Sequence, residues 1–402
     1  MIYIFYPSNI MGGAEYLLIK TANLLYNNNY DVGVIDFENG WVSKNINNEK
    51  IVKIYFDGNK KIKLEDDDFL ITTSNFMYKL DSYFEKSKAR ILLWTVHPHN
   101  AIVGFPIIFK KIPLSGILQD KYLSYKEPIH KKNLESIITK KGMVAMDGES
   151  DDTLFRKYNL RYSGFLPVFI HDSSFNNEIS RKIEAECIRI LWLGRIDLEF
   201  KIHILKKLLL DIDFVSKKSK ETFIFDIIGD GPGLKELRLF VKENLSLKVS
   251  FLGEIPTEKL SDIIPKYDIG FAMGTSALDI AAKKIPTILL DFSYSEVLKY
   301  NYRWIFETQQ YTLGRDISSL SQKNIESMNS IKDIISQLKS NKYHLSEKSY
   351  DYVCNNHSSE STFIRLKSCI STSEFTLEDV YGYRLTKPFW NSVHRLVFNF
   401  RK

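Results

Sequence analysis

The sequence predicts an α/β protein with two doubly wound domains in tandem and a helical C-terminal tail. Its 402 residues are 44% hydrophobic, which is enough to bury more than one core and excludes one small domain. Short β-branched or aromatic runs alternate with amphipathic stretches, a pattern typical of parallel sheets covered by helices on both faces. A polar loop near residue 170 separates two such series.

In the first series, apolar runs predict strands and one amphipathic stretch predicts a helix. The expected strands are Ile2–Tyr6, Asp31–Asp36, Phe69–Thr73 and Arg90–Val96, and the expected helix is Ala14–Asn27. The pattern weakens between residues 100 and 160. The loop at Phe165–Asn177 contains Pro167 and a Ser- and Asn-rich run, which is typical of a linker. We therefore place the N-terminal domain at residues 1–170.

The second series is clearer, and we expect its five strands to form a second sheet. These strands are Ile188–Leu193, Phe223–Ile228, Val249–Leu252, Ile269–Met273 and Thr287–Asp291. The helices expected between them are Ile202–Ser216, Leu234–Asn244, Thr257–Tyr267 and Ser276–Lys284. After Glu296 the sequence is largely helical in pattern. We place the C-terminal domain at residues 178–370 and the tail at residues 371–402.

The composition excludes several classes of protein. With 26% charged residues, 19 Gly and 11 Pro, the chain is neither disordered nor fibrous. After Asp379 there is no acid, and the bases there are Arg384, Lys387, Arg395, Arg401 and Lys402. Without these five, 50 of the 55 basic residues remain against 49 acidic ones. Because the body is neutral, we expect no nucleic-acid partner.

The cysteines and the N-terminus predict a cytoplasmic protein. Cys187, Cys354 and Cys369 are an odd number without Cys-x-x-Cys spacing, which favours reduced thiols over disulfides or a zinc site. Met1 leads directly into an apolar run without a signal-peptide pattern. No apolar stretch approaches the ~18 residues that span a bilayer, so we expect any membrane contact to be peripheral, at the inner face of the plasma membrane.

Two doubly wound domains in tandem place a cleft between the carboxyl ends of their strands, where such sheets bind ligands. The first strand-end turn contains Gly12 and Gly13, which let backbone N–H groups approach a ligand at a helix start. A tight turn without a ligand explains these glycines equally well. The turn lacks the Gly-x-Gly-x-x-Gly pattern of dinucleotide-binding proteins.

Three further turns follow predicted strands of the second domain. In the turn that begins at Gly194, Arg195 and Lys201 bracket a loop before a helix, as expected for stabilising a diphosphate leaving group; a solvated Arg and Lys are the alternative. Gly229 and Gly231 end the next strand before Pro232, a favourable first helical residue.

The last of these turns lies between the predicted strand Ile269–Met273 and its helix. Gly274, Thr275 and Ser276 lead into the helix, whose first amides and hydroxyls are suited to an anion. Asp279 follows one turn later and is suited to accept hydrogen bonds from a ribose diol. An N-cap followed by an acid in the helix is the alternative interpretation.

With these motifs in order, the chain resembles retaining nucleotide-sugar glycosyltransferases of the GT-B type, which have two Rossmann-like domains facing each other across a cleft. It is similar to bacterial enzymes that build surface polysaccharides such as O-antigen and capsule. The resemblance covers most of the chain and implies that the first domain binds the acceptor and the second the nucleotide sugar. The matching segments are Gly12–Glu15, Gly194–Lys201, Gly229–Pro232 and Ser276–Pro286.

The resemblance also assigns residues that spacing alone does not. It places His97 at the sugar's reactive carbon, Asp147 at the acceptor, and Glu254 and Ile255 at the nucleobase. The expected catalytic residues are His97, Arg195 and Lys201. The expected donor-binding residues are Gly12, Gly13, Gly194, Arg195, Lys201, Gly229, Gly231, Glu254, Ile255, Gly274, Thr275, Ser276 and Asp279.

The sequence departs from the family in the loop before Asp279. The family carries Glu-x7-Glu there, whereas this chain has Asp279 at the second position and Phe271 at the first. The first glutamate contacts the donor sugar in the family, so the identity of the donor is open. Ile202, rather than the usual Gly, follows Lys201.

We expect transfer of a sugar from a nucleoside diphosphate donor to a lipid-linked glycan acceptor, with retained configuration and without a metal or other cofactor. Asp211-Ile-Asp213 has the Asp-x-Asp spacing of a different transferase fold, but we interpret it as a solvated helix terminus. The alternatives are a sugar-nucleotide epimerase of the same fold, with Glu15, Asp120 or Asp147 as acid or base, and a non-catalytic partner protein that retains the fold.

The basic tail has two interpretations. From Pro388, apolar residues recur at spacings that gather them on one helical face, namely Phe389, Trp390, Val393, Leu396, Val397 and Phe400. A basic amphipathic helix of this kind is suited to an anionic membrane surface. A final helix that packs back on the first domain fits the same pattern.

Overall fold

The computed structural model describes the chain except residues 11, 104–114, 171–174, 176–186, 321–327 and 384–402. It divides into two compact units, one of Met1–Pro167 together with the residues from Phe363 onward, and one of Val168–Thr362. We had placed residues up to 370 in the second domain. In the structure the first unit resumes at Phe363, and Arg90 Nη1 of that unit donates to Ile370 O at 3.0 Å.

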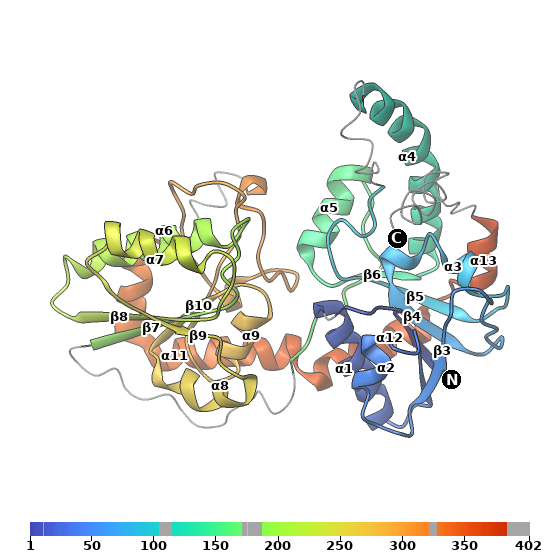
Figure 1. The fold of residues 1–402 in the computed structure, drawn as a ribbon, viewed down its shortest axis with the longest axis horizontal. Helices are drawn as coiled ribbons and strands as arrows, with labels where there is room; N and C mark the ends of the chain where they lie inside the picture. The colour runs from blue at the N-terminus through green and yellow to red at the C-terminus, as the bar shows by residue number, and fades with distance from the viewer. Residues whose placement is uncertain (11, 104–114, 171–174, 176–186, 321–327, 384–402) are drawn as a thin grey trace. The chain divides into compact units, whose positions relative to one another are not determined.

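The first unit contains a parallel six-stranded sheet in the order β3-β2-β1-β4-β5-β6. The strands are β1 Ile2–Phe5, β2 Val32–Asp36, β3 Val52–Tyr55, β4 Phe69–Thr73, β5 Arg90–Thr95 and β6 Met143–Ala145. The helices are α1 Gly13–Asn27, α2 Trp41–Asn45, α3 Leu80–Tyr83, α4 Ser115–Thr139, α5 Gly148–Tyr158, α13 Leu377–Gly382 and the part of α12 Ser359–Thr372 that follows Thr362. Figure 1 shows α1 and α2 near the N-terminal strands of this unit.

The second unit contains a six-stranded sheet in the order β12-β11-β10-β7-β8-β9. The strands are β7 Cys187–Leu193, β8 Thr222–Ile228, β9 Lys248–Gly253, β10 Ile269–Ala272, β11 Thr287–Leu289 and β12 Arg303–Trp304. The helices are α6 Ile202–Ser216, α7 Leu234–Asn244, α8 Thr257–Ile263, α9 Thr275–Ala281 and α11 Ile331–His357. Five strands were expected; the sixth, β12, pairs antiparallel with β11.

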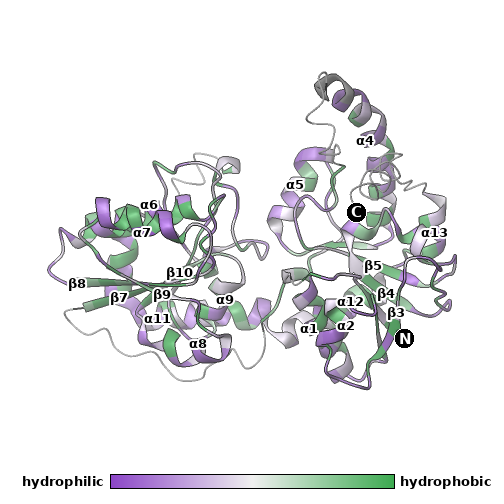
Figure 2. Ribbon diagram, in the orientation of Figure 1, coloured by the Kyte–Doolittle hydropathy of each residue, from purple (hydrophilic) through white to green (hydrophobic). Residues whose placement is uncertain are grey.

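Hydrophobic patterning explains these elements. All residues of β2 and β4 are buried, as expected for strands covered on both faces. In Figure 2 most strands of both sheets are coloured hydrophobic, whereas the helices carry both colours. The helix α6 is amphipathic, and it buries Ile204, Leu205 and Leu208 in the core of the second unit.

The predicted strands of both domains are confirmed, with ends that differ by one or two residues, and α6 and α7 have the predicted bounds. Three strands were not predicted. β3 is mostly exposed, β6 has three residues and β12 has two, so none has a long buried run. The helix expected at Thr257–Tyr267 is α8 followed by a 3₁₀ turn at Ile264–Lys266.

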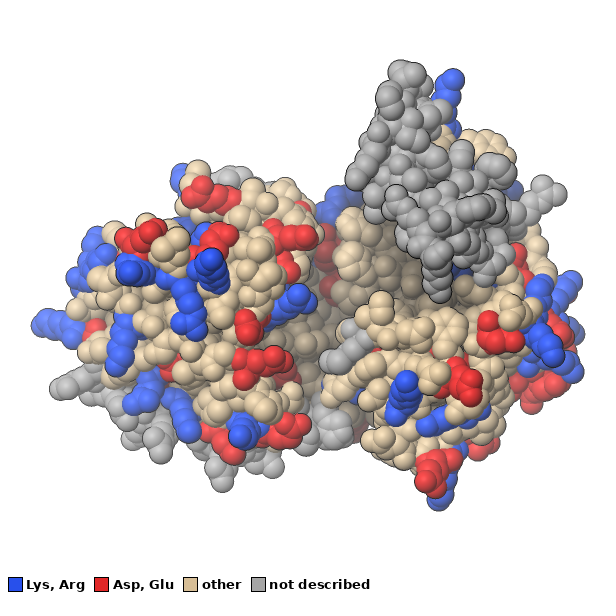
Figure 3. Space-filling model, in the orientation of Figure 1, with Lys and Arg blue, Asp and Glu red and all other residues tan. Residues whose placement is uncertain are grey.

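The C-terminal tail is described only as far as Tyr383, and α13 buries Leu377 and Val380 against the first unit. The amphipathic segment expected from Pro388 lies outside the described residues. Among the described residues, no helix combines the length and the hydropathy required to cross a membrane. Acidic and basic side chains are interspersed over the face shown in Figure 3.

Candidate functional site

Two of the predicted turns, those after β7 and β8, meet next to the carboxyl end of β9. The Gly194 N–H donates to Ile228 O at 3.0 Å, and the Gly229 N–H donates to Gly253 O at 2.8 Å. At Gly229 φ is +138°, and a Cβ atom there would lie 2.1 Å from Gly194 O. Only glycine fits both this backbone conformation and this close approach. The glycines therefore allow the loops after β7 and β8 to pack closely against each other.

A second set of contacts fixes the loop that carries Arg195. The Ile196 N–H donates to Asp230 O at 2.9 Å, and Ile196 O accepts from the Gly233 N–H at 3.0 Å. A Cβ at Gly231 would lie 2.3 Å from Ile196 O. Ile196 is fully buried, which leaves Arg195 exposed at the surface of the loop. The backbone on both sides of the arginine is thus fixed by β8–α7 contacts.

The turn between β10 and α9 joins the same group of loops. The Cβ position of Gly194 lies 3.9 Å from Ser276 Oγ, the nearest atom to it. Gly274 has φ +68°, ψ −150° and precedes α9, which starts at Thr275 rather than Ser276. The structure therefore brings Gly194, Gly229, Gly231, Ser276 and their neighbours to one edge of the second sheet.

Arg195 and Lys201 place two cations at this edge. Lys201 is half-buried at the start of α6. Burial lowers the pKa of Lys201, Asp197 raises it, and the positive charge of Arg195 lowers it further. In the described part of the chain, neither Arg195 nor Lys201 forms an ion pair. Two neighbouring cations that form no ion pair with a described carboxylate are suited to receive an anion.

The remaining residues of this loop hold Lys201 in place. Asp197 Oδ1 accepts from the backbone N–H groups of Glu199 and Phe200, at 2.7 and 3.2 Å. Lys201 Nζ lies 5.9 Å from the centroid of the Phe200 ring. Phe200 in turn packs edge-to-face on Phe292, with centroids 5.7 Å apart. The loop is thus supported from the segment that follows β11.

Asp279 is half-buried on α9, one helical turn before Lys283. Lys283 is buried, and its pKa is lowered by burial and raised by Asp279 and Asp262. A ribose diol at Asp279 would meet a carboxylate that already interacts with a neighbouring ammonium.

Phe271 occupies the position of the missing glutamate and cannot contact a ligand. It is fully buried within β10, and its ring lies 6.1 Å from that of Tyr302. The short turn after β10 is instead flanked by a distant segment, because the Gly274 N–H donates to Leu313 O at 2.8 Å. Sequence reasoning missed this segment, and no motif marks it.

Asp291 holds that segment and was also missed. It is fully buried at the end of β11, and Arg303 forms a two-pronged ion pair with it. Asp291 also accepts from Tyr300 Oη at 3.1 Å and from the Arg315 N–H at 2.8 Å. A carboxylate buried with this many donors fixes the backbone at both ends of the loop.

In the first unit, the Gly12–Gly13 turn lies beside a carboxylate. Glu15 is buried in the first turn of α1, and its Oε1 accepts from Ser8 Oγ at 2.7 Å. A Cβ at Gly12 would lie 2.6 Å from Glu15 Oε2. A carboxylate beside Gly12 disfavours an adjacent phosphate. This argues against the expectation that Gly12 and Gly13 contact the donor diphosphate.

His97 lies in the loop after β5 and is exposed. Its Nδ1 accepts from the His99 N–H at 3.2 Å, and partial burial together with His99 lowers the pKa of His97. His130 Nε2 lies 2.8 Å from Ala101 O, and the Val103 N–H donates to Tyr158 Oη at 3.2 Å. Side chains of α4 and α5 therefore anchor the loop that presents His97.

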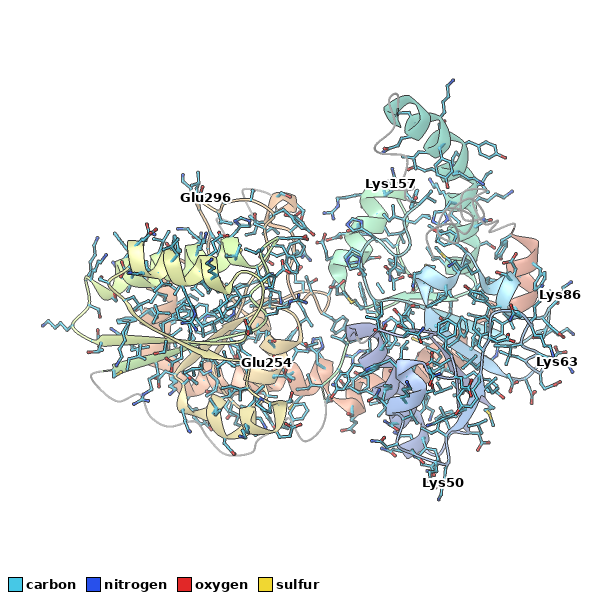
Figure 4. The ribbon with its side chains drawn as sticks, viewed as in Figure 1. Lys50, Lys63, Lys86, Lys157, Glu254 and Glu296 are labelled. Carbon is cyan, nitrogen blue, oxygen red and sulfur yellow. The ribbon has the colours of Figure 1, made fainter. Side chains whose placement is uncertain are left out.

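Asp147 is the N-cap of α5. Its Oδ1 accepts from the Ser150 N–H at 2.9 Å and from Ser150 Oγ at 2.7 Å, and the residue is buried. This capping role accounts for one carboxylate oxygen. In the second unit, Glu254 follows β9 and is exposed (Figure 4), and Ile255 is half-buried beside the apolar cluster of the sheet.

The interpretation of Asp211-Ile-Asp213 as a solvated terminus was wrong for Asp213. That residue is buried, and its Oδ1 accepts from Ser246 N–H, Ser246 Oγ and Leu247 N–H. Asp211 bonds Lys207 and Tyr302. Both carboxylates join helix α6 to neighbouring segments. Within the described ranges, no group of three His, Cys, Asp or Glu residues is arranged to hold a metal.

The sequence matches no protein-family model and no curated protein, but solved structures share its fold. A glycosyltransferase from Rickettsia africae is 15% identical, with a TM-score of 0.58 over 92% of this chain and 97% of that one. The fold is that of GT-B glycosyltransferases. The lipopolysaccharide outer core galactosyltransferase WaaB is 10% identical, with a TM-score of 0.56 over 92% and 98% of the two chains. WaaG, involved in lipopolysaccharide biosynthesis, is 10% identical, with a TM-score of 0.51 over 93% and 100%.

Proposed function

We propose that this protein is a retaining glycosyltransferase that transfers a sugar from a nucleoside diphosphate donor to a glycan acceptor. The observation that carries the proposal is the pair Arg195 and Lys201 at the carboxyl edge of the second sheet, where neither forms an ion pair with a described carboxylate. The GT-B fold supports it, because ligands of doubly wound sheets bind at this edge.

The chemistry follows from charge. In the transfer, the bond between the anomeric carbon and the diphosphate oxygen breaks while an acceptor hydroxyl attacks the same face of the sugar and passes its proton to the departing diphosphate. Negative charge then builds on the departing diphosphate. Preorganised cations at that oxygen lower the barrier, and removing one such donor typically costs about 10²-fold in rate. The fixed backbone around Arg195 provides this preorganisation.

The other residues bind the nucleotide and orient the sugar. Asp279 accepts hydrogen bonds from the ribose, and the backbone at Glu254 and Ile255 faces the base. We assign His97 to the reactive carbon of the sugar on the basis of the family resemblance. The reaction requires no metal, since Arg195 and Lys201 supply the positive charge at the diphosphate.

The proposed acceptor is a lipid-linked glycan of bacterial surface polysaccharide such as O-antigen or capsule. WaaB and WaaG, which share the fold, are described as enzymes of lipopolysaccharide. The basic residues after Asp379 support attachment to the inner face of the plasma membrane. The protein would then meet its acceptor at the membrane surface from the cytoplasmic side.

Titration calorimetry with a panel of nucleoside diphosphate sugars tests the proposal. We expect one donor to bind, and we expect Arg195→Ala and Lys201→Ala each to weaken it at least tenfold. Lys235→Ala is the matched control, because Lys235 is an exposed cation of the same unit. A non-catalytic partner protein would bind no donor tightly. An epimerase would invert a sugar carbon of the donor when no acceptor is present.

A further inference from the structure

A cavity of about 310 Å³ lies in the second unit, beyond the edge strand β12. Its polar lining comes from Arg303, Glu307, Thr308, Gln309, Thr312 and Arg315, and two apolar side chains complete it. The donor loops at Gly194, Gly229 and Ser276 are not part of the lining. The volume is at the lower end of small-molecule sites.

Two hydrogen-bond donors of this lining have no partner among the described residues. They are Arg303 Nε and Thr308 Oγ1, and both atoms are buried. Leaving a buried donor unpaired costs free energy, about 1–3 kcal/mol for a neutral group and more for a charged one. Folded proteins pair such groups, so two of them lining one cavity indicate that a ligand supplies the missing acceptors.

Two guanidinium groups of the lining can donate hydrogen bonds to an anionic group. Arg303 is fixed by its two-pronged ion pair with Asp291, and the described residues offer no acceptor to its Nε. Arg315 is a second guanidinium in the lining, with Nη2 3.5 Å from Thr312 Oγ1. Guanidinium groups match the oxygens of a phosphate or carboxylate.

The rest of the lining favours hydroxyl groups beside that anion. Glu307 offers carboxylate oxygens, one of which accepts from the Trp304 N–H at 2.9 Å, and Gln309 offers an amide. A carboxylate repels a bare anion but accepts hydrogen bonds from a sugar hydroxyl. The combination of two guanidiniums, hydroxyls, an amide and one carboxylate matches a small molecule that is both anionic and hydroxylated.

We propose that this cavity binds an anionic sugar, either a sugar phosphate or a sugar acid, at a site separate from the donor loops. The proposal does not depend on the glycosyltransferase function, because binding is measured without turnover. One short segment runs between the two sites: Leu313 O accepts from the Gly274 N–H of the donor edge, and Arg315, two residues later, lines the cavity.

Calorimetry on the full chain distinguishes the ligand classes, with glucose 6-phosphate, glucuronate, inorganic phosphate and glucose as probes. We expect at least one of the two anionic sugars to bind at least tenfold more tightly than glucose and inorganic phosphate. The tighter of the two identifies phosphate or carboxylate as the anionic group. Equal affinity for inorganic phosphate and the anionic sugars would overturn the assignment to a sugar ligand, and no binding of either would overturn the site.

Variants separate a binding role from a structural one. Thr308→Val removes the unpaired hydroxyl with little change of shape, so it should leave the melting temperature unchanged or raise it, and weaken the anionic sugar about fivefold. Arg315→Gln should weaken it about tenfold, with Lys299→Ala, an exposed cation nearby in the chain, as the control without effect. Unchanged affinity in both variants, a lower melting temperature in Thr308→Val, or displacement of the probe by UDP would overturn the proposal.

Discussion

The position that a Cβ of Gly229 would occupy lies 2.1 Å from the carbonyl oxygen of Gly194. This contact joins the loops after β7 and β8, and one of these loops carries Arg195. The site thus depends on close approach of two backbones rather than on side chains alone. The effects of this close approach on stability and on donor binding can be measured separately.

Gly229→Ala should damage both stability and donor binding. The methyl group collides with backbone, and φ of +138° is strained for any residue with a Cβ, which together cost on the order of 1–3 kcal/mol. Thermal unfolding and donor calorimetry measure the two effects. Gly164→Ala is the control, because a Cβ there meets no atom within 4 Å. Equal behaviour of the two variants would contradict the proposed role of the contact.

Lys201→Met should stabilise the protein while it abolishes tight donor binding. Burial and Arg195 lower the pKa of Lys201. At neutral pH the charged ammonium therefore reduces the free energy of unfolding. The gain in stability of the variant should be constant below the pKa that Lys201 has in the folded protein. It should shrink as pH rises from there towards the ordinary lysine value of 10.5. Melting temperatures of both proteins across this range provide the measurement. A less stable variant at pH 7 would show that Lys201 has a structural partner.

Turnover should fall on the acid side as His97 becomes protonated. Burial and His99 lower its pKa below 6.5, so the imidazole is neutral at pH 7, and charging it also disfavours the folded loop as pH falls through that lowered pKa. The pH profile of kcat should lose this acid limb in His97→Asn, with the rate at pH 7 reduced about 10²-fold. An acid limb that persists in the variant would assign it to another group.

Deleting residues 387–402 should release the protein from anionic vesicles in a flotation assay. The segment carries four of the five bases that follow Asp379, each worth about 1 kcal/mol near anionic lipid. Because α13 ends at Gly382 with Leu377 and Val380 buried, the deletion leaves the described packing intact, and the melting temperature should stay nearly constant. A large fall in melting temperature with unchanged flotation would favour a helix that packs on the folded protein.

The strands and helices of the second unit could be predicted because their signals are local. α6 repeats apolar residues with helical spacing, and β7 and β8 are continuous apolar runs. β12 could not be predicted, because two residues carry no periodicity and its pairing with β11 depends on the whole sheet. The same holds for β6, whose three residues are fixed by their neighbour β5.

The candidate site likewise contains residues that the sequence indicates and residues that only the structure reveals. Arg195, Lys201 and the glycines could be found because each follows a recognisable strand. The capping role of Asp147 and the folding of Glu15 over Gly12 required the structure, since spacing alone does not say which way a carboxylate turns. Asp291, Arg303 and Arg315 carry no motif, and only their side-chain and backbone bonds reveal them.

The sequence by itself determined the α/β class, the order of most elements and the loops at which a ligand site was expected, because hydrophobic periodicity and glycine turns are properties of neighbouring residues. Only the tertiary structure decided that Phe271 is buried in place of the missing glutamate, that Leu313 bonds Gly274, and that a polar cavity lies beyond β12. These features arise from contacts between segments far apart in the chain. Such contacts form when the sheet assembles and leave no local pattern in the residues that make them.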